Sequence, residues 1–215
     1  MTRKRLIAVL AAAVLMFLCA GYAICDTAEK DHFNRGLDYI KQRDYKKGAD
    51  EFIEVLKINP QNDRAYYNMG ACYAALGQNQ KAIAYHKKAV EINPGHADAY
   101  AYLGVIYFIL GENSNAIASY EKAIQIDPSS AIICNNLGAV YSSLKQYQKA
   151  IPYYERAIKI DPGYVAAYSN LGEDYSLLGQ HQKARENLLK AKELYQKKGD
   201  SRGVQKIEEK LEKLP

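Results

Sequence analysis

Hydrophobic residues recur along most of the chain at spacings of three and four, in paired stretches of roughly 14 residues separated by short polar breaks. Such spacings put side chains on one face of an α-helix. The pairs return every 34 residues, an interval marked by Pro60, Pro94, Pro128 and Pro162. Proline cannot continue a helix, although it is tolerated near the start of the next one. The pattern therefore predicts five helix–turn–helix units, at residues 29–62, 63–96, 97–130, 131–164 and 165–198.

Small and aromatic residues fill the same columns of the five units when each proline is numbered position 32. Position 8 is glycine and position 11 is tyrosine in every unit, while positions 20 and 27 are alanine in the last four units. A small side chain at positions 8 and 20 lets the two helices of a unit approach closely, and alanine at position 27 does the same toward the next unit. Position 24 is Phe52, His86, Tyr120, Tyr154 and Leu188 in turn.

This set of columns resembles the tetratricopeptide repeat, whose unit has small residues at positions 8, 20 and 27, aromatic residues near 4, 11 and 24, and proline at 32. The resemblance covers residues 29–198 and implies an all-α fold, a right-handed α-solenoid of helix–turn–helix repeats that ends in a capping helix. The first unit departs from the pattern at His32, Arg35 and Gly48, and the fifth unit lacks the proline.

A further helix is predicted beyond the repeats, within residues 200–215. Gly199 and Asp200 are typical of a helix stop followed by an N-cap. The apolar residues that follow form one stripe on a charged helix: Val204, Ile207, Leu211 and Leu214. We interpret this segment as the capping helix that covers the last repeat, and a separate partner-binding helix is the alternative.

Residues 1–25 have the pattern of an export signal or a membrane anchor. Arg3, Lys4 and Arg5 precede an apolar run, and small residues follow it, as in a cleavable signal peptide. The uncharged stretch over residues 6–25 is also long enough to span a bilayer as one helix, so a retained anchor is the alternative. Either version exports the rest of the chain across the cytoplasmic membrane, as a periplasmic or secreted protein or one anchored to the inner membrane.

Charge and motifs argue against nucleic-acid binding and catalysis. The net charge of +5 includes three basic residues of the leader, and their removal leaves +2, which is too balanced for a nucleic-acid surface. The sequence has no phosphate loop, HExxH, GxSxG or CxxC motif, so we expect no catalytic residues, no metal and no cofactor. His86 occupies an aromatic core column, and Cys72 and Cys134 are interpreted as small core residues.

In the family that the chain resembles, positions 2, 5, 6, 9, 12 and 13 of the first helix of each unit line an inner, concave groove. Position 6 is asparagine in four of five units: Asn34, Asn68, Asn136 and Asn170. An amide donates and accepts hydrogen bonds, and the resemblance implies that such a row holds an extended peptide. Satisfaction of local backbone groups explains these asparagines equally well. Further candidate groove residues are Tyr67, Tyr102, Val105, Phe108, Ile109 and Asn135.

We therefore expect a non-catalytic scaffold that binds a peptide or protein segment in the groove. One subclass of the family grips a C-terminal carboxylate with lysine at position 5 and asparagine at position 9. That pair is missing here, because the first three units carry other residues there: Phe33 and Leu37, Tyr67 and Ala71, Ala101 and Val105. The alternative is a structural protein that acts by self-association, as a homo-oligomer, or as an accessory subunit of a membrane complex.

Overall fold

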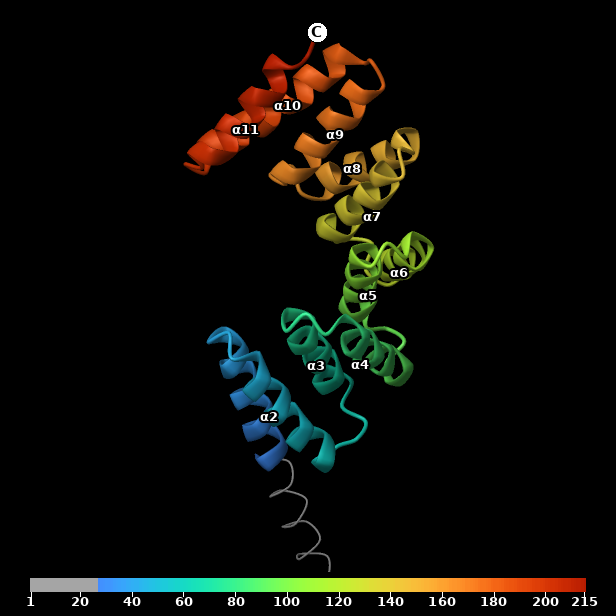
Figure 1. Cartoon of the computed structure of the whole chain (residues 1–215), viewed down its shortest axis with the longest axis vertical. Helices are drawn as coiled ribbons and strands as arrows, with labels where there is room; N and C mark the ends of the chain where they lie inside the picture. The colour runs from blue at the N-terminus through green and yellow to red at the C-terminus, as the bar shows by residue number, and fades with distance from the viewer. Residues whose placement is uncertain (1–26) are drawn as a thin grey trace, which may run out of the picture. The chain divides into compact units, whose positions relative to one another are not determined.

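The computed structural model describes residues 27–215, and the predicted leader at residues 1–25 lies outside the described residues. All regular structure in the described part is α-helical (Figure 1), which confirms the predicted all-α fold class. The chain is helical over residues 27–41. The helices that follow are α2 (Tyr45–Ile58), α3 (Asp63–Ala75), α4 (Asn79–Ile92), α5 (Ala97–Ile109), α6 (Asn113–Ile126), α7 (Ala131–Ser143), α8 (Tyr147–Ile160), α9 (Val165–Leu177), α10 (His181–Lys197) and α11 (Ser201–Glu212). Within residues 27–215, no helix is both long and apolar enough to cross a membrane.

The residues that recur at fixed positions of the repeat make the contacts that hold each helix pair together. A Cβ atom added to Gly138 would lie 2.7 Å from the Tyr154 ring, and one added to Gly104 would lie 2.8 Å from the Tyr120 ring. These distances are too short for ordinary van der Waals contact, so position 8 must be glycine where position 24 packs against it. The alanines at positions 20 and 27 of the last four repeats are completely buried.

A left-handed residue closes the turn inside every helix pair. Position 15 has a positive φ in each repeat: Arg43 at 62°, Gly77 at 73°, Gly111 at 76°, Lys145 at 58° and Gly179 at 71°. Glycine adopts this conformation without steric cost, whereas residues with a Cβ atom do so at some expense. The geometry of the turn is therefore the same in all five repeats even where the residue differs.

The chain divides after Pro94 into two compact units. The first unit contains the helix over residues 27–41 and helices α2–α4, around a core that includes Phe52, Val55, Met69 and Cys72. The second unit contains helices α5–α11, in which each helix packs against the next one along the chain. Cys72 and Cys134 are both buried, with free thiols.

Helix α11 packs against α10 in the second unit. Ile207 and Leu214 are buried in the same core cluster as Leu171 and Leu188. The Asp200 side chain accepts a hydrogen bond from the backbone nitrogen of Gly203 at 2.9 Å and so caps the start of the helix. The apolar stripe of residues 200–215 is thus covered by the last repeat, while the charged face of α11 points to solvent.

Candidate functional site

The four asparagines at position 6 use their amides in different ways. In the first unit, Asn34 is exposed, whereas Nδ2 of Asn68 donates to the backbone oxygen of Arg64 at 2.8 Å, within the same helix. The Asn68 amide therefore satisfies a backbone group of its own helix. This is one of the two roles predicted for these asparagines, the other being peptide binding. The amide oxygen of Asn68 has no hydrogen-bond donor among the described residues.

In the second unit the asparagines join neighbouring repeats. Nδ2 of Asn170 on α9 donates to Oδ1 of Asn135 on α7 at 2.9 Å, and Nδ2 of Asn135 lies 3.4 Å from Oδ1 of Asn136. Asn135 is only 6% exposed. These three amides consequently contribute to repeat packing as well as to the inner face.

The apolar candidates of the second unit lie on one helix. Tyr102, Val105, Phe108 and Ile109 belong to α5, at inner positions 6, 9, 12 and 13 of its repeat. Tyr102 is 40% exposed and Ile109 is 66% exposed, whereas Val105 and Phe108 are half-buried. Exposed aromatic and aliphatic side chains of this kind are typical of protein interaction sites. Tyr67 belongs to the first unit, where its ring packs 5.6 Å from the ring of the buried His86.

A hollow of about 310 Å³ opens on the inner positions of the first repeat. Its lining comes from positions 1, 2, 5, 6 and 9 of the helix over residues 27–41, from the residue before α3 and from the start of α3. The lining residues are Glu29, Lys30, Phe33, Asn34, Leu37, Asn62 and Arg64. Among these, only Asn34 was a candidate from the repeat columns. Lys30, Phe33 and Leu37 could be identified from sequence, because they occupy inner positions of the same helix. Asn62 and Arg64 could not, because their approach to the hollow depends on how the loop before α3 folds.

The inner positions of the last repeat are mostly polar, and α11 contacts two of them. Nζ of Lys210 donates to Oγ of Ser169 at 2.8 Å and pairs with the Glu173 carboxylate. The adjacent Asp174 is 1% exposed and accepts a hydrogen bond from Oγ of Ser142 on α7 at 2.6 Å. Burial raises the pKa of Asp174 to about 6, an effect that the Ser142 hydrogen bond opposes and the Glu173 charge reinforces.

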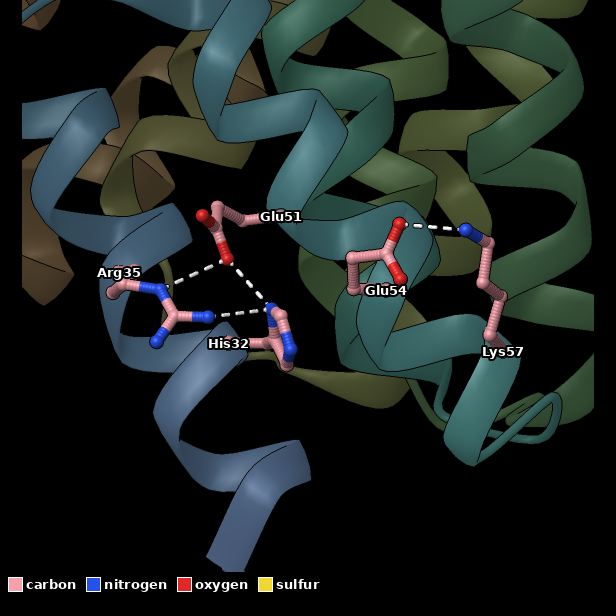
Figure 2. A network of polar contacts seen from close by, with 5 residues as sticks. All are labelled: His32, Arg35, Glu51, Glu54 and Lys57. Carbon is pink, nitrogen blue, oxygen red and sulfur yellow. Dashed lines mark hydrogen bonds and ion pairs between the residues drawn. The ribbon is translucent and has the colours of Figure 1, made fainter.

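The departures of the first repeat form a polar cluster (Figure 2). Nδ1 of His32 lies 2.7 Å from Oε2 of Glu51, and Nε of Arg35 donates to the same oxygen at 3.1 Å. Burial opposes ionisation of Glu51, but the hydrogen bonds from His32 and Arg35 hold the pKa of this carboxyl below its usual value. The same two columns, 4 and 23, hold the stacked Tyr66 and Tyr85 in the second repeat. In the first repeat, polar contacts thus stand where the second repeat has stacked aromatic rings.

Among residues 27–215, no group of three or more His, Cys, Asp or Glu side chains is placed to hold a metal ion. Burial raises the pKa of the Cys72 thiol to about 11, which disfavours the reactive thiolate. The features of the described surface suited to binding are the apolar face of α5, the hollow in the first repeat and the asparagine amides.

Comparison with protein families gives matches to the repeat over most of the described chain. Models described as tetratricopeptide repeat match residues 129–197, 63–96 and 87–118, and one described as TPR repeat matches residues 106–145. No curated protein sequence matches the chain.

Several solved structures have a similar fold. The crystal structure of MamA has a TM-score of 0.71 and 32% sequence identity, and the match covers 76% of this chain and 96% of that chain. The PilF protein of Pseudomonas aeruginosa has a TM-score of 0.70 at 16% identity, with 88% and 93% of the two chains covered. YrrB, described as a TPR protein with an unusual peptide-binding site, has a TM-score of 0.66 at 18% identity, with 83% and 90% covered. At such identities the last two show the fold alone.

Proposed function

We propose, since the chain belongs to the tetratricopeptide repeat family, that it is a non-catalytic scaffold that binds a peptide or protein segment on the inner positions of its repeats. The observation that carries the proposal is the apolar face of α5, where Tyr102 is 40% and Ile109 is 66% exposed. A family member of similar fold, YrrB, is described as having a peptide-binding site. Membership in the family supports a role in protein interaction. The exposure of Tyr102 and Ile109 is the reason for placing the binding surface on α5.

The proposal also places the scaffold outside the cytoplasmic membrane. This part rests on the basic start and apolar run of residues 1–25, which are typical of exported proteins. N-terminal sequencing of the protein from its native cells distinguishes a cleaved leader from a retained anchor. A mature chain that begins near residue 24 supports a signal peptide, whereas an intact N-terminus in the membrane fraction supports the anchor.

Affinity capture with matched variants tests the binding surface. Full-length chain carrying Tyr102→Ser and Ile109→Ser should lose a partner that the wild-type chain captures from the native membrane fraction, because both apolar contacts are removed. Leu189→Ser is the control, since Leu189 is 50% exposed on α10 at a position outside the inner set. Equal capture by all three chains, at equal helical content in circular dichroism, contradicts the proposal.

Self-association is the competing function. The observation in its favour is that Leu189 on α10, which lies outside the inner positions, is 50% exposed. Light scattering of the full-length chain over a range of concentrations separates the two functions. A monomer at all concentrations excludes self-association, whereas an oligomer that Leu189→Ser dissociates would favour it over the scaffold.

A further inference from the structure

We infer that the hollow in the first repeat recognises an acidic side chain that lies close to an apolar residue in a bound peptide. The inference rests on the proposed function and names the chemistry of its ligand. The hollow is built at inner positions of the first repeat, where positions 5 and 9 are Phe33 and Leu37. It therefore uses a different set of groups from the lysine and asparagine that grip a terminal carboxylate in other family members.

Arg64 supplies the main cationic group of the hollow. It is exposed, and its guanidinium lies 4.9 Å from the centre of the Phe33 ring. No carboxylate within residues 27–215 pairs with this guanidinium. A guanidinium presents a planar fork of N–H donors that matches a carboxylate in two parallel hydrogen bonds. Arg64 also lies in the first turn of α3, where the helix dipole favours a negative charge.

The lining of the hollow holds two further charged residues. Lys30 is a second cation in the lining, and Glu29 is the one acidic residue of the lining set. Oε1 of Glu29 accepts hydrogen bonds from Nδ2 of Asn62 at 2.7 Å and from Nδ2 of Asn59 at 3.1 Å. The carboxylate of Glu29 is thus held by the loop that precedes α3, while the ring of Phe33 holds Arg64 in place.

Phe33 and Leu37 give the hollow its apolar part. Both are half-buried, and the Phe33 ring packs edge-on against the buried Phe52 at 5.4 Å between ring centres. This packing fixes the apolar surface next to the Arg64 guanidinium. In an extended peptide, side chains two positions apart point to the same side. An acidic residue and an apolar residue at that spacing fit the two parts of the hollow together, with the amide of Asn34 at its edge.

A binding assay on the full-length chain tests this pairing. The probes are short peptides, acetylated and amidated at their ends, that carry Glu and Leu or Phe two positions apart. Matched peptides carry Gln or Lys in place of Glu. We expect the Glu peptides to bind about tenfold more tightly than the Gln peptides, the size of effect that one charge-assisted contact gives, and the Lys peptides to bind least.

Matched variants assign the effect to the hollow. Arg64→Gln should remove the preference for Glu over Gln, and Lys30→Gln should reduce it. Arg185→Gln is the control, because Arg185 is an exposed arginine on α10 outside the inner positions. Circular dichroism of each variant checks that the helices are intact.

The outcomes separate the inference from the proposed function. If the wild-type chain binds no peptide of any class, the inference is overturned, whereas the proposed function fails only if the Tyr102→Ser and Ile109→Ser chain captures the partner as well as the wild type does. If the wild-type chain binds Gln or Lys peptides as well as Glu peptides, or if Arg64→Gln and Lys30→Gln both keep the Glu preference, only the inference is overturned. Tight binding of Gln peptides that end in a free carboxylate, lost in Arg64→Gln, would also overturn it, because the hollow would then read the terminus rather than a side chain.

Discussion

At the scale of single residues, the turn of every repeat depends on one left-handed residue. Three of the five positions are glycine, but Arg43 and Lys145 adopt the same conformation with φ values of 62° and 58°. The left-handed region costs a residue with a Cβ atom about 1 kcal/mol or more. Both side chains are exposed, so little packing is lost when they are replaced.

We expect Lys145→Gly to raise the free energy of unfolding by about 0.5–1 kcal/mol, because relief of strain exceeds the entropy cost of glycine. Urea denaturation followed by circular dichroism measures the change. Gly111→Ala is the reciprocal control and should lower stability by about 1 kcal/mol. A lower midpoint for Lys145→Gly would contradict the account of the turn.

Asp174 is a buried carboxyl whose protonation the fold favours. It is 1% exposed, and its Oδ2 atom has no hydrogen-bond partner among the described residues. Because burial raises its pKa to about 6, the folded chain holds this proton more tightly than the unfolded chain does. The contribution of Asp174 to stability is therefore greatest in acid and is lost as the pH rises from about 4 to about 6.

We expect Asp174→Asn to be more stable than the wild-type chain above pH 6, by at most about 3 kcal/mol. Asparagine can still accept the hydrogen bond from Ser142 without burying a charge. Thermal denaturation at several pH values should give two stability curves that diverge between pH 4 and pH 6 and stay parallel above. Asp161→Asn, at an exposed carboxyl, is the control, and curves that never diverge would rule out the raised pKa.

At the scale of elements, α11 is attached through buried contacts and through partly exposed ion pairs. Ile207 is 1% exposed in the core of the last repeat, while Lys210 and Lys192 make partly exposed ion pairs with Glu173 and Glu208. Exposed ion pairs contribute little, so the apolar contact should dominate the attachment. We expect Ile207→Ala to cost about 2–5 kcal/mol.

The loss should be local to the end of the chain. Hydrogen exchange of the α11 amides should accelerate strongly in Ile207→Ala, whereas exchange in α5–α8 should stay the same. Lys206→Ala, at an exposed position of the same helix, should leave exchange unchanged. Uniform acceleration over α5–α11 would show that α11 supports the whole second unit rather than capping its last repeat.

The helix pairs could be predicted from sequence because their contacts are enforced by size. Gly138 must lack a Cβ atom where Tyr154 packs, and such a constraint recurs visibly in every repeat. The hydrogen bond between Asn170 and Asn135 could not be predicted, because it depends on the rotation of α9 relative to α7. The hollow beside Arg64 was missed for a related reason, since the fold of the loop before α3 brings Arg64 and Asn62 to its rim.

At the scale of the whole molecule, the two units offer different inner surfaces. The first unit has a cationic hollow with an apolar part, centred on Arg64 and Phe33. The second unit has the exposed apolar face of α5, followed by asparagines and a Lys210–Glu173 pair that are occupied within the unit. The first surface favours a ligand with an acidic group, and the second favours a ligand with apolar groups.

Site-specific photocrosslinking shows whether a partner protein binds at the inner positions of α5. A photoreactive phenylalanine analogue is placed at Ile109 or, as the control, at Leu189, two exposed positions of the second unit, and the full-length chain is irradiated in its native cells. If a partner binds on the inner positions, a discrete covalent adduct with a partner protein should form from the position of Ile109, and little or none from that of Leu189. Adducts from the position of Leu189 alone, or equal adducts from both, would contradict binding on the inner positions.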